Sequence, residues 1–134
     1  MYMEMAQVVS TQSYDTDTQV GALLVRNGNV LSMGWNGMPA GCDNNCKNHT
    51  GATNWEVLHA EANAILKCAK EGRSTEGATL YCTLSPCREC AKLILQAGIS
   101  KVVFATTYKD EAGLIFLKNN QVEIQSCKMT KSQS

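Results

Sequence analysis

Residues 78–106, with the sequence ATLYCTLSPCRECAKLILQAGISKVVFAT, predict a strand, a helix and a second strand in immediate succession. Apolar and β-branched side chains dominate both ends of this stretch, as is typical of buried strands. Pro86 can open the helix between them, and Gly98 can end it. Because a crossover helix joins the two strands, we expect them to be parallel.

The part of the chain that precedes this unit predicts a helix and a hairpin. The first dozen residues form a short apolar-periodic segment, and the run VGALLV at 20–25 indicates a strand buried on both faces. Asn27 and Gly28 adopt positive φ at low cost, so they predict a hairpin turn before a return strand over 30–35. The hairpin adds an antiparallel pair to the sheet.

The remaining elements complete an alternation of helices and strands. Apolar stripes and breakers predict helices over 55–71 and 110–118 and a last strand over 122–124. The fold class is therefore α/β, a three-layer α/β/α sandwich with a central mixed five-stranded sheet. We expect a single domain over 1–134, with a polar tail from about residue 127.

The composition narrows the classes of function. Twelve basic and twelve acidic residues cancel, so the basic footprint of a nucleic-acid binder is missing and a small substrate is favoured. No apolar run is long enough for a membrane span, and the N-terminal residues do not resemble a secretory signal. Seven cysteines, an odd number that includes a C-x-x-C pair, favour metal ligation in a reducing cytoplasm over a disulfide framework.

Two short motifs carry the chemistry. His59 stands two residues before Glu61, and Cys87 and Cys90 follow Pro86 at C-x-x-C spacing. Imidazole and thiolate are preferred zinc ligands, and three of them leave the fourth position of a catalytic site open. The combination of H-x-E with P-C-x-x-C is the signature of zinc deaminases that act on nucleobases.

Glu61 is the predicted catalytic residue because its carboxylate can carry protons between water and the ring without ligating the metal. The alternative is a structural zinc site, closed by a fourth ligand such as Cys82 or Cys46. Such a site has no need of a carboxylate beside His59, so the joint motif favours catalysis.

The chain resembles the deoxycytidylate (dCMP) deaminases of the cytidine-deaminase superfamily. The segments that carry the resemblance are DTQVGA at 17–22, GWNGMPAGC at 34–42, HAEANAI at 59–65 and SPCRECAKLILQAG at 85–98. The resemblance implies a cytidine-deaminase-like fold and the conversion of dCMP and water to dUMP and ammonia. It also implies a cytoplasmic homohexamer, activated by dCTP and inhibited by dTTP with a bound Mg²⁺ ion.

The resemblance further implies two sets of binding residues. Those expected at the substrate are Thr18 and Asn36 near the sugar and phosphate, the Ala60 backbone, the Ser85 carbonyl, and Tyr108 against the nucleotide. Those expected at the regulatory nucleotide are Gly34, Trp35, Asn36 and Gly37. Lys109 after Tyr108 departs from the histidine of some members, which leaves the phosphate contacts open; Arg26 is one candidate.

Several alternatives remain at this point. Another small substrate, such as dCTP, cytidine or guanine, would suit the same chemistry, whereas nucleic-acid editing is disfavoured by the neutral charge. A zinc-stabilised binding module without activity is a further possibility. Cys42, Cys46 and His49 form an incomplete set for a second, structural zinc, and free thiols are the favoured interpretation.

Overall fold

The computed structural model describes residues 1–15 and 17–127. Thr16 and all but the first residue of the predicted polar tail lie outside the described residues. The elements, in chain order, are α1 (Tyr2–Ser10), β1 (Gly21–Arg26), β2 (Asn29–Trp35), α2 (Ala60–Glu71), β3 (Thr79–Leu84), α3 (Arg88–Gln96), β4 (Lys101–Thr106), α4 (Ala112–Asn119) and β5 (Glu123–Ser126).

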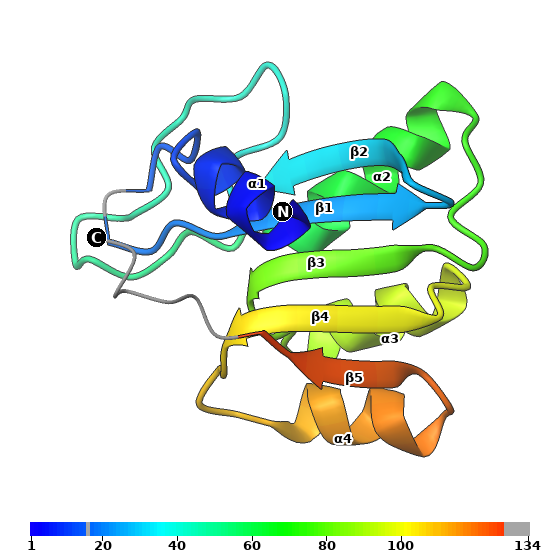
Figure 1. Cartoon of the computed structure of the whole chain (residues 1–134). Helices are drawn as coiled ribbons and strands as arrows, with labels where there is room; N and C mark the ends of the chain where they lie inside the picture. Colours follow the sequence, from blue (N-terminus) through cyan, green and yellow to red (C-terminus); the bar gives the residue numbers. More distant parts are fainter. Residues whose placement is uncertain (16, 128–134) are drawn as a thin grey trace.

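The sheet has five strands in the order β2-β1-β3-β4-β5 (Figure 1). β1 pairs antiparallel with both β2 and β3, whereas β3, β4 and β5 are parallel to one another. The predicted mixed sheet and the parallel unit at 78–106 are therefore confirmed. β1 lies between β2 and β3, so the hairpin forms one side of the sheet with β2 as its edge strand.

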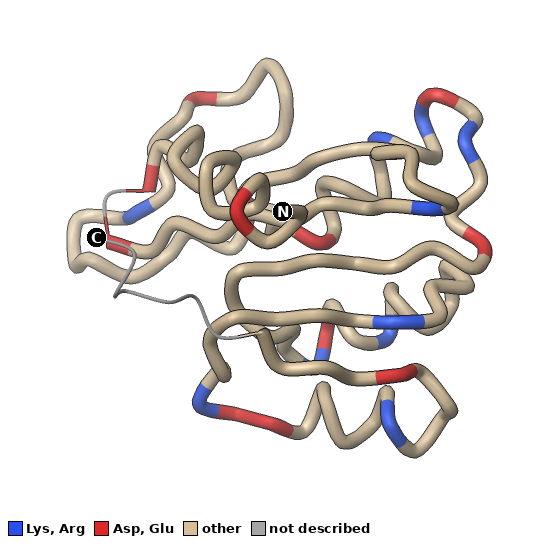
Figure 2. Tube along the Cα trace, in the orientation of Figure 1, with Lys and Arg blue, Asp and Glu red and all other residues tan. Residues whose placement is uncertain are grey.

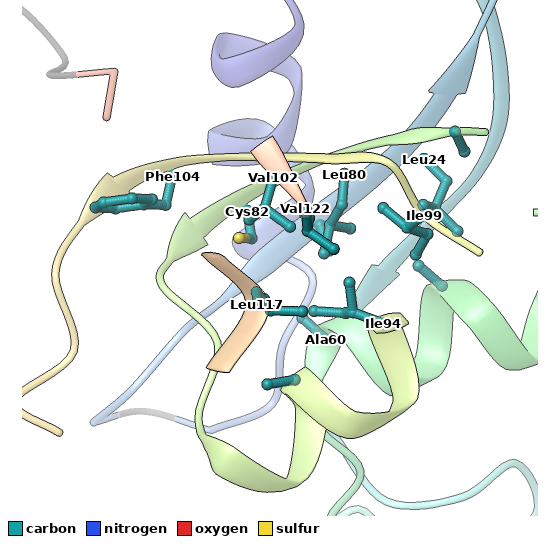
Figure 3. Close-up of a cluster of buried hydrophobic side chains, with 14 of the residues drawn as sticks. Leu24, Ala60, Leu80, Cys82, Ile94, Ile99, Val102, Phe104, Leu117 and Val122 are labelled. Atoms are coloured by element: carbon teal, nitrogen blue, oxygen red, sulfur yellow. The ribbon is translucent and has the colours of Figure 1, made fainter. Parts of the chain in front are cut away.

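Helices cover both faces of the sheet, which makes the three predicted layers (Figure 1). α1 packs alone on one face, where Met3, Ala6 and Val9 are buried against β1 and β4. α2, α3 and α4 pack on the other face and bury the main core. Figure 3 shows this core, in which side chains of the sheet meet Ala60, Ile94 and Leu117 of the three helices.

The hairpin between β1 and β2 forms as expected. Asn27 and Gly28 have φ values of 52° and 77°, the left-handed conformations that a tight antiparallel turn requires. The five residues of β1 before Arg26 are buried, in agreement with a strand covered on both faces.

The prediction of a helix from Trp55 was wrong, because α2 begins at Ala60. Leu58 instead forms a bridge with Gly37, with its N–H and carbonyl both bonded to the Gly37 backbone at 2.8 and 3.0 Å. Trp55 is 89% exposed, so its apolar side chain does not contribute to the helical stripe. The connection between β2 and α2, called the long loop below, therefore spans residues 36–59.

The charged residues are spread over the chain. Figure 2 shows acidic and basic positions interspersed along the trace rather than gathered on one element. Within the described ranges 1–15 and 17–127, no helix combines the length and apolar character needed to cross a bilayer.

Candidate metal centre and substrate cavity

Two helix N-termini bring three ligand side chains together. His59 is the N-cap residue of α2, Cys87 is the N-cap residue of α3, and Cys90 lies in the first turn of α3. The His59 Nδ1 atom lies 3.4 Å from the Sγ of Cys87 and 3.3 Å from the Sγ of Cys90. The three ligand atoms all lie within 4.8 Å of one another, so one ion can contact all of them.

This donor set fits zinc. An imidazole and two thiols are the soft and borderline ligands that Zn²⁺ prefers, and three of them leave a coordination position open. Neither Cys82 nor Cys46, the residues considered for closing a structural site, joins this cluster. In the part of the chain that the structure describes, no other group of three such residues comes together.

The thiols influence each other's protonation. Hydrogen bonds from Cys90 and His59 lower the pKa of Cys87 to about 3, which makes it a thiolate at neutral pH. The same contact with Cys87, together with burial, raises the pKa of Cys90. Because a zinc ligand must be deprotonated, binding of the metal displaces the Cys90 proton, and metal affinity rises with pH.

Glu61 stands beside this centre in the first turn of α2 and is only 4% exposed. Burial raises the pKa of the Glu61 carboxyl to about 7, so this side chain is able to take up and release a proton near neutral pH. A dication on the neighbouring ligands would favour its ionised form, which is the form that acts as a base.

A cavity of about 410 Å³ opens over the centre. It lies between the N-terminal loop, the long 36–59 loop, the starts of α2 and α3, and the segment after β4. Its lining residues are Asp15, Thr18, Val20, Asn36, Thr53, Val57, His59, Ala60, Glu61, Leu84, Ser85, Cys87, Tyr108 and Lys109. A cavity with both polar and apolar lining residues, two of them members of the candidate metal cluster, is suited to a small polar ring compound.

The structure gathers the residues expected at the substrate. All five of them line this cavity, although each comes from a different segment of the chain: Thr18, Asn36, Ala60, Ser85 and Tyr108. Of the residues expected at the regulatory nucleotide, only Asn36 lines it. Gly34, Trp35 and Gly37 lie outside the cavity lining.

The Asn36 side chain is hydrogen-bonded to backbone groups in one wall of the cavity. Its Oδ1 accepts from the Val20 N–H at 2.9 Å, and its Nδ2 donates to the Thr18 carbonyl at 2.8 Å. Its own carbonyl accepts from the Ser13 hydroxyl at 2.8 Å. Asn36 therefore connects the segment expected at the regulatory nucleotide to the loop that carries Thr18.

Sequence reasoning missed Asp15 as a member of the cavity. Asp15 is 2% exposed; its Oδ1 accepts from the backbone of Asp17 and Thr18, and its Oδ2 pairs with Lys47 at 3.2 Å. Burial acts to raise its pKa, but these backbone hydrogen bonds and Lys47 hold the pKa of Asp15 below its usual range. The pair ties the long loop to the N-terminal loop, and no local pattern links residues so far apart.

Two other candidates lie elsewhere. Arg26, at the far end of β1 from the cavity, donates to the carbonyls of Ser74 and Glu76. Cys42 and His49 are exposed whereas Cys46 is buried, so the possible second zinc set is not assembled. None of the seven cysteines, all of which lie among the described residues, takes part in a disulfide.

The α/β/α fold, the His-Cys-Cys centre and the buried glutamate together define the class of zinc-dependent deaminases. Residues 1–106 match the family model described as the cytidine and deoxycytidylate deaminase zinc-binding region. The chain belongs to this family and is a hydrolytic deaminase.

Individual relatives are similar over most of the chain. The deoxycytidylate deaminase of Enterobacteria phage T2 is 36% identical over 165 residues, covering 91% of this chain and 88% of that protein. The deoxycytidylate deaminase of Homo sapiens is 39% identical over 111 residues, covering 77% of this chain and 61% of that protein. The crystal structure of dCMP deaminase from the cyanophage S-TIM5, in complex with dCMP and dUMP, superposes with a TM-score of 0.91 at 42% identity, covering 94% of this chain and 93% of that one.

Proposed function

We propose that this protein deaminates dCMP hydrolytically to dUMP and ammonia. The observation that carries the proposal is a single cavity lined by His59 and Cys87 of the three-ligand cluster, by buried Glu61 and by the five residues expected at the nucleotide. The likeness to a relative whose structure was determined with dCMP and dUMP supports the choice of substrate.

His59, Cys87 and Cys90 would hold the zinc ion. When bound there, zinc lowers the pKa of a water molecule to about 7 and so makes a nucleophile available at neutral pH. Glu61 takes the proton of that water, passes it to the ring nitrogen and then helps to protonate the departing ammonia. A single carboxylate serves all these steps because it gives up each proton that it accepts and so returns to its ionised form.

The cavity walls orient the ring in this proposal. The Ala60 backbone meets the pyrimidine carbonyl, the Ser85 carbonyl accepts from the amine that leaves, and Tyr108 packs against the nucleotide. Ala60 is fully buried in the main core (Figure 3). Ser85 is 2% exposed. Both contacts are made by backbone groups, so neither depends on a mobile side chain. Such fixed partners place the reactive carbon without further reorganisation.

Lys109 supplies positive charge for the phosphate, with Thr18 and Asn36 beside the sugar. Of the residues that line the cavity, Lys109 is the one with a lysine or arginine side chain. The carboxylate of Asp15, which also lines the cavity, is paired with Lys47 and so repels an anion less. A nucleoside monophosphate therefore suits the cavity better than a neutral nucleoside.

Regulation is a second part of the proposal: dCTP activates the enzyme and dTTP inhibits it, each bound with Mg²⁺. The nucleotides bind at the loop that contains Gly34, Trp35, Asn36 and Gly37, and the enzyme is a homohexamer. Asn36 supports this coupling, because it belongs to the loop and also fastens Thr18 and Val20 at the cavity. The free thiols are in keeping with a cytoplasmic, reducing environment.

The decisive experiment measures ammonia release from dCMP, dCTP, deoxycytidine and guanine, each with and without dCTP and dTTP. We expect dCMP to be preferred, with dCTP and dTTP shifting its saturation curve in opposite directions. Preference for another substrate would remove the dCMP assignment, and an unchanged curve would remove the regulatory one. Glu61→Gln should retain zinc and lose at least about 100-fold in turnover, whereas substantial residual activity would contradict its role as proton carrier.

A further inference from the structure

The segment 107–111, between β4 and α4, forms the side of the cavity on which the phosphate is proposed to bind. Tyr108 and Lys109 both line the cavity. Tyr108 is held at one point, since its N–H donates to Ser85 Oγ at 2.7 Å. A single hydrogen bond leaves the rest of a loop free to move, so Lys109 needs further anchoring to hold a defined position.

A second anchor ties this segment to the turn that carries the zinc ligands. The Nε of Arg88 donates to Asp110 Oδ2 at 2.8 Å. Arg88 is the first residue of α3 and stands between Cys87 and Cys90 in the chain. The other oxygen of Asp110, Oδ1, accepts from the Ala112 N–H at 3.0 Å and so helps to begin α4.

The exposure of this ion pair argues against a role in global stability. The Arg88 side chain is 72% exposed and that of Asp110 is 38% exposed. Exposed ion pairs contribute little to the free energy of unfolding, since water and salt screen them. Neither residue lines the cavity, so neither is placed to contact the substrate directly. What the pair can determine is where the intervening segment lies.

The pair also affects the charge next to Lys109. Both oxygens of the adjacent Asp110 carboxylate are engaged, one by Arg88 and one by the Ala112 backbone. Among the residues that the structure describes, Lys109 has no carboxylate within ion-pair distance. Its ammonium group is thus available to an anion in the cavity. Without Arg88, the Asp110 carboxylate would compete for it.

We propose that Arg88 and Asp110 are positioning residues that hold Lys109 toward the anionic end of the substrate. The proposal rests on the proposed function for the identity of that substrate, a nucleoside monophosphate. It predicts an effect on binding of the phosphate, transmitted through the 107–111 segment, and no effect on the chemical step at Glu61.

The test compares Arg88→Gln, Asp110→Asn and the double variant with the wild type, using dCMP and deoxycytidine as substrates. Asn at 110 retains an acceptor for the Ala112 N–H, so the start of α4 is preserved. Lys92→Gln is the matched control, because Lys92 is a similarly exposed cation on the same helix, paired with Glu89. Arg88→Lys tests rescue by a conservative change, and zinc content is measured for every variant.

We expect each single variant to raise KM for dCMP about fivefold, with kcat within about twofold and KM for deoxycytidine unchanged. The double variant should be no worse than either single one, because both remove the same interaction. Arg88→Lys should restore most of the affinity. Equal losses for both substrates, an unchanged KM for dCMP, or multiplicative effects in the double variant would overturn the proposal.

Hydrogen exchange provides a readout that does not depend on turnover. The amides of 107–111 should exchange faster in Arg88→Gln than in the wild type, and at the wild-type rate in Lys92→Gln. Unchanged exchange in Arg88→Gln would overturn the positioning role. If the wild type released no ammonia from dCMP, the proposed function would fail, while the exchange measurement would still decide whether Arg88 positions the segment.

Discussion

Replacing Gly113 by alanine has two opposite effects on the free energy of unfolding. Gly113 is the second residue of α4, and alanine in a helix is favoured over glycine by up to about 1 kcal/mol. However, a Cβ at this position would lie 2.5 Å from the Pro86 carbonyl oxygen and 2.8 Å from that of Cys87. Both are backbone atoms that cannot rotate away, so α4 or the Cys87 turn must move.

The steric effect should exceed the gain in helix propensity. Overpacking of this kind costs about 1–3 kcal/mol, and contact with backbone places it toward the upper end of that range. We therefore expect Gly113→Ala to lower the free energy of unfolding by about 1–2 kcal/mol. Because the displaced atoms belong to Cys87, the variant should also release zinc faster to a chelator.

Urea unfolding of the zinc-loaded protein, together with the rate of zinc transfer to a chelator, measures both effects. Ala112→Gly is the control: it changes helix propensity in the same turn without adding an atom, so it should lower stability by no more than about 1 kcal/mol and leave zinc release unaltered. A Gly113→Ala protein as stable as the wild type, with the same zinc release rate, would refute the close approach of α4 to the Cys87 turn.

Two further predictions concern charged residues of the cavity. Asp15→Asn should destabilise the protein by about 1–3 kcal/mol at neutral pH through loss of charge-assisted bonds. Because the pKa of Asp15 is lowered in the folded state, the stability it contributes is present above the unfolded value of about 4 and is lost as pH falls through the folded value. The free energies of unfolding of the two proteins, measured in urea, should therefore converge as the pH falls below about 4. A difference that stays constant down to pH 3 would disprove this origin. In steady-state kinetics, Lys109→Gln should raise KM for dCMP about tenfold and leave KM for deoxycytidine unchanged. Equal effects on both substrates would exclude a phosphate contact.

The local sequence pattern was sufficient to predict those elements that depend on neighbouring residues. The turn at Asn27 and Gly28, the strand at 101–106 and the helix after Pro86 each depend on residues that are neighbours in the chain. The start of α2 was predicted five residues too early, because the apolar side chains from Trp55 to Leu58 continue a helical stripe. The backbone of Leu58 is instead hydrogen-bonded to Gly37, a partner that no local pattern indicates.

The sequence by itself determined the donors of the metal centre. His59, Cys87 and Cys90 are recognisable because zinc requires particular ligand types, and the three-residue spacing of Cys87 and Cys90 places both thiols at one helix turn. Glu61 follows from the same local geometry, being two residues from His59 at the start of the same helix.

Only the tertiary structure decided how the cavity around that centre is closed and charged. The pairing of Asp15 with Lys47, the tie between Arg88 and Asp110, and the place of Lys109 in the cavity lining all join segments far apart in the chain. Contacts of this kind depend on the strand order and on the way that loops fold back over the sheet. An ion pair carries no periodicity or spacing that would mark its two members in advance.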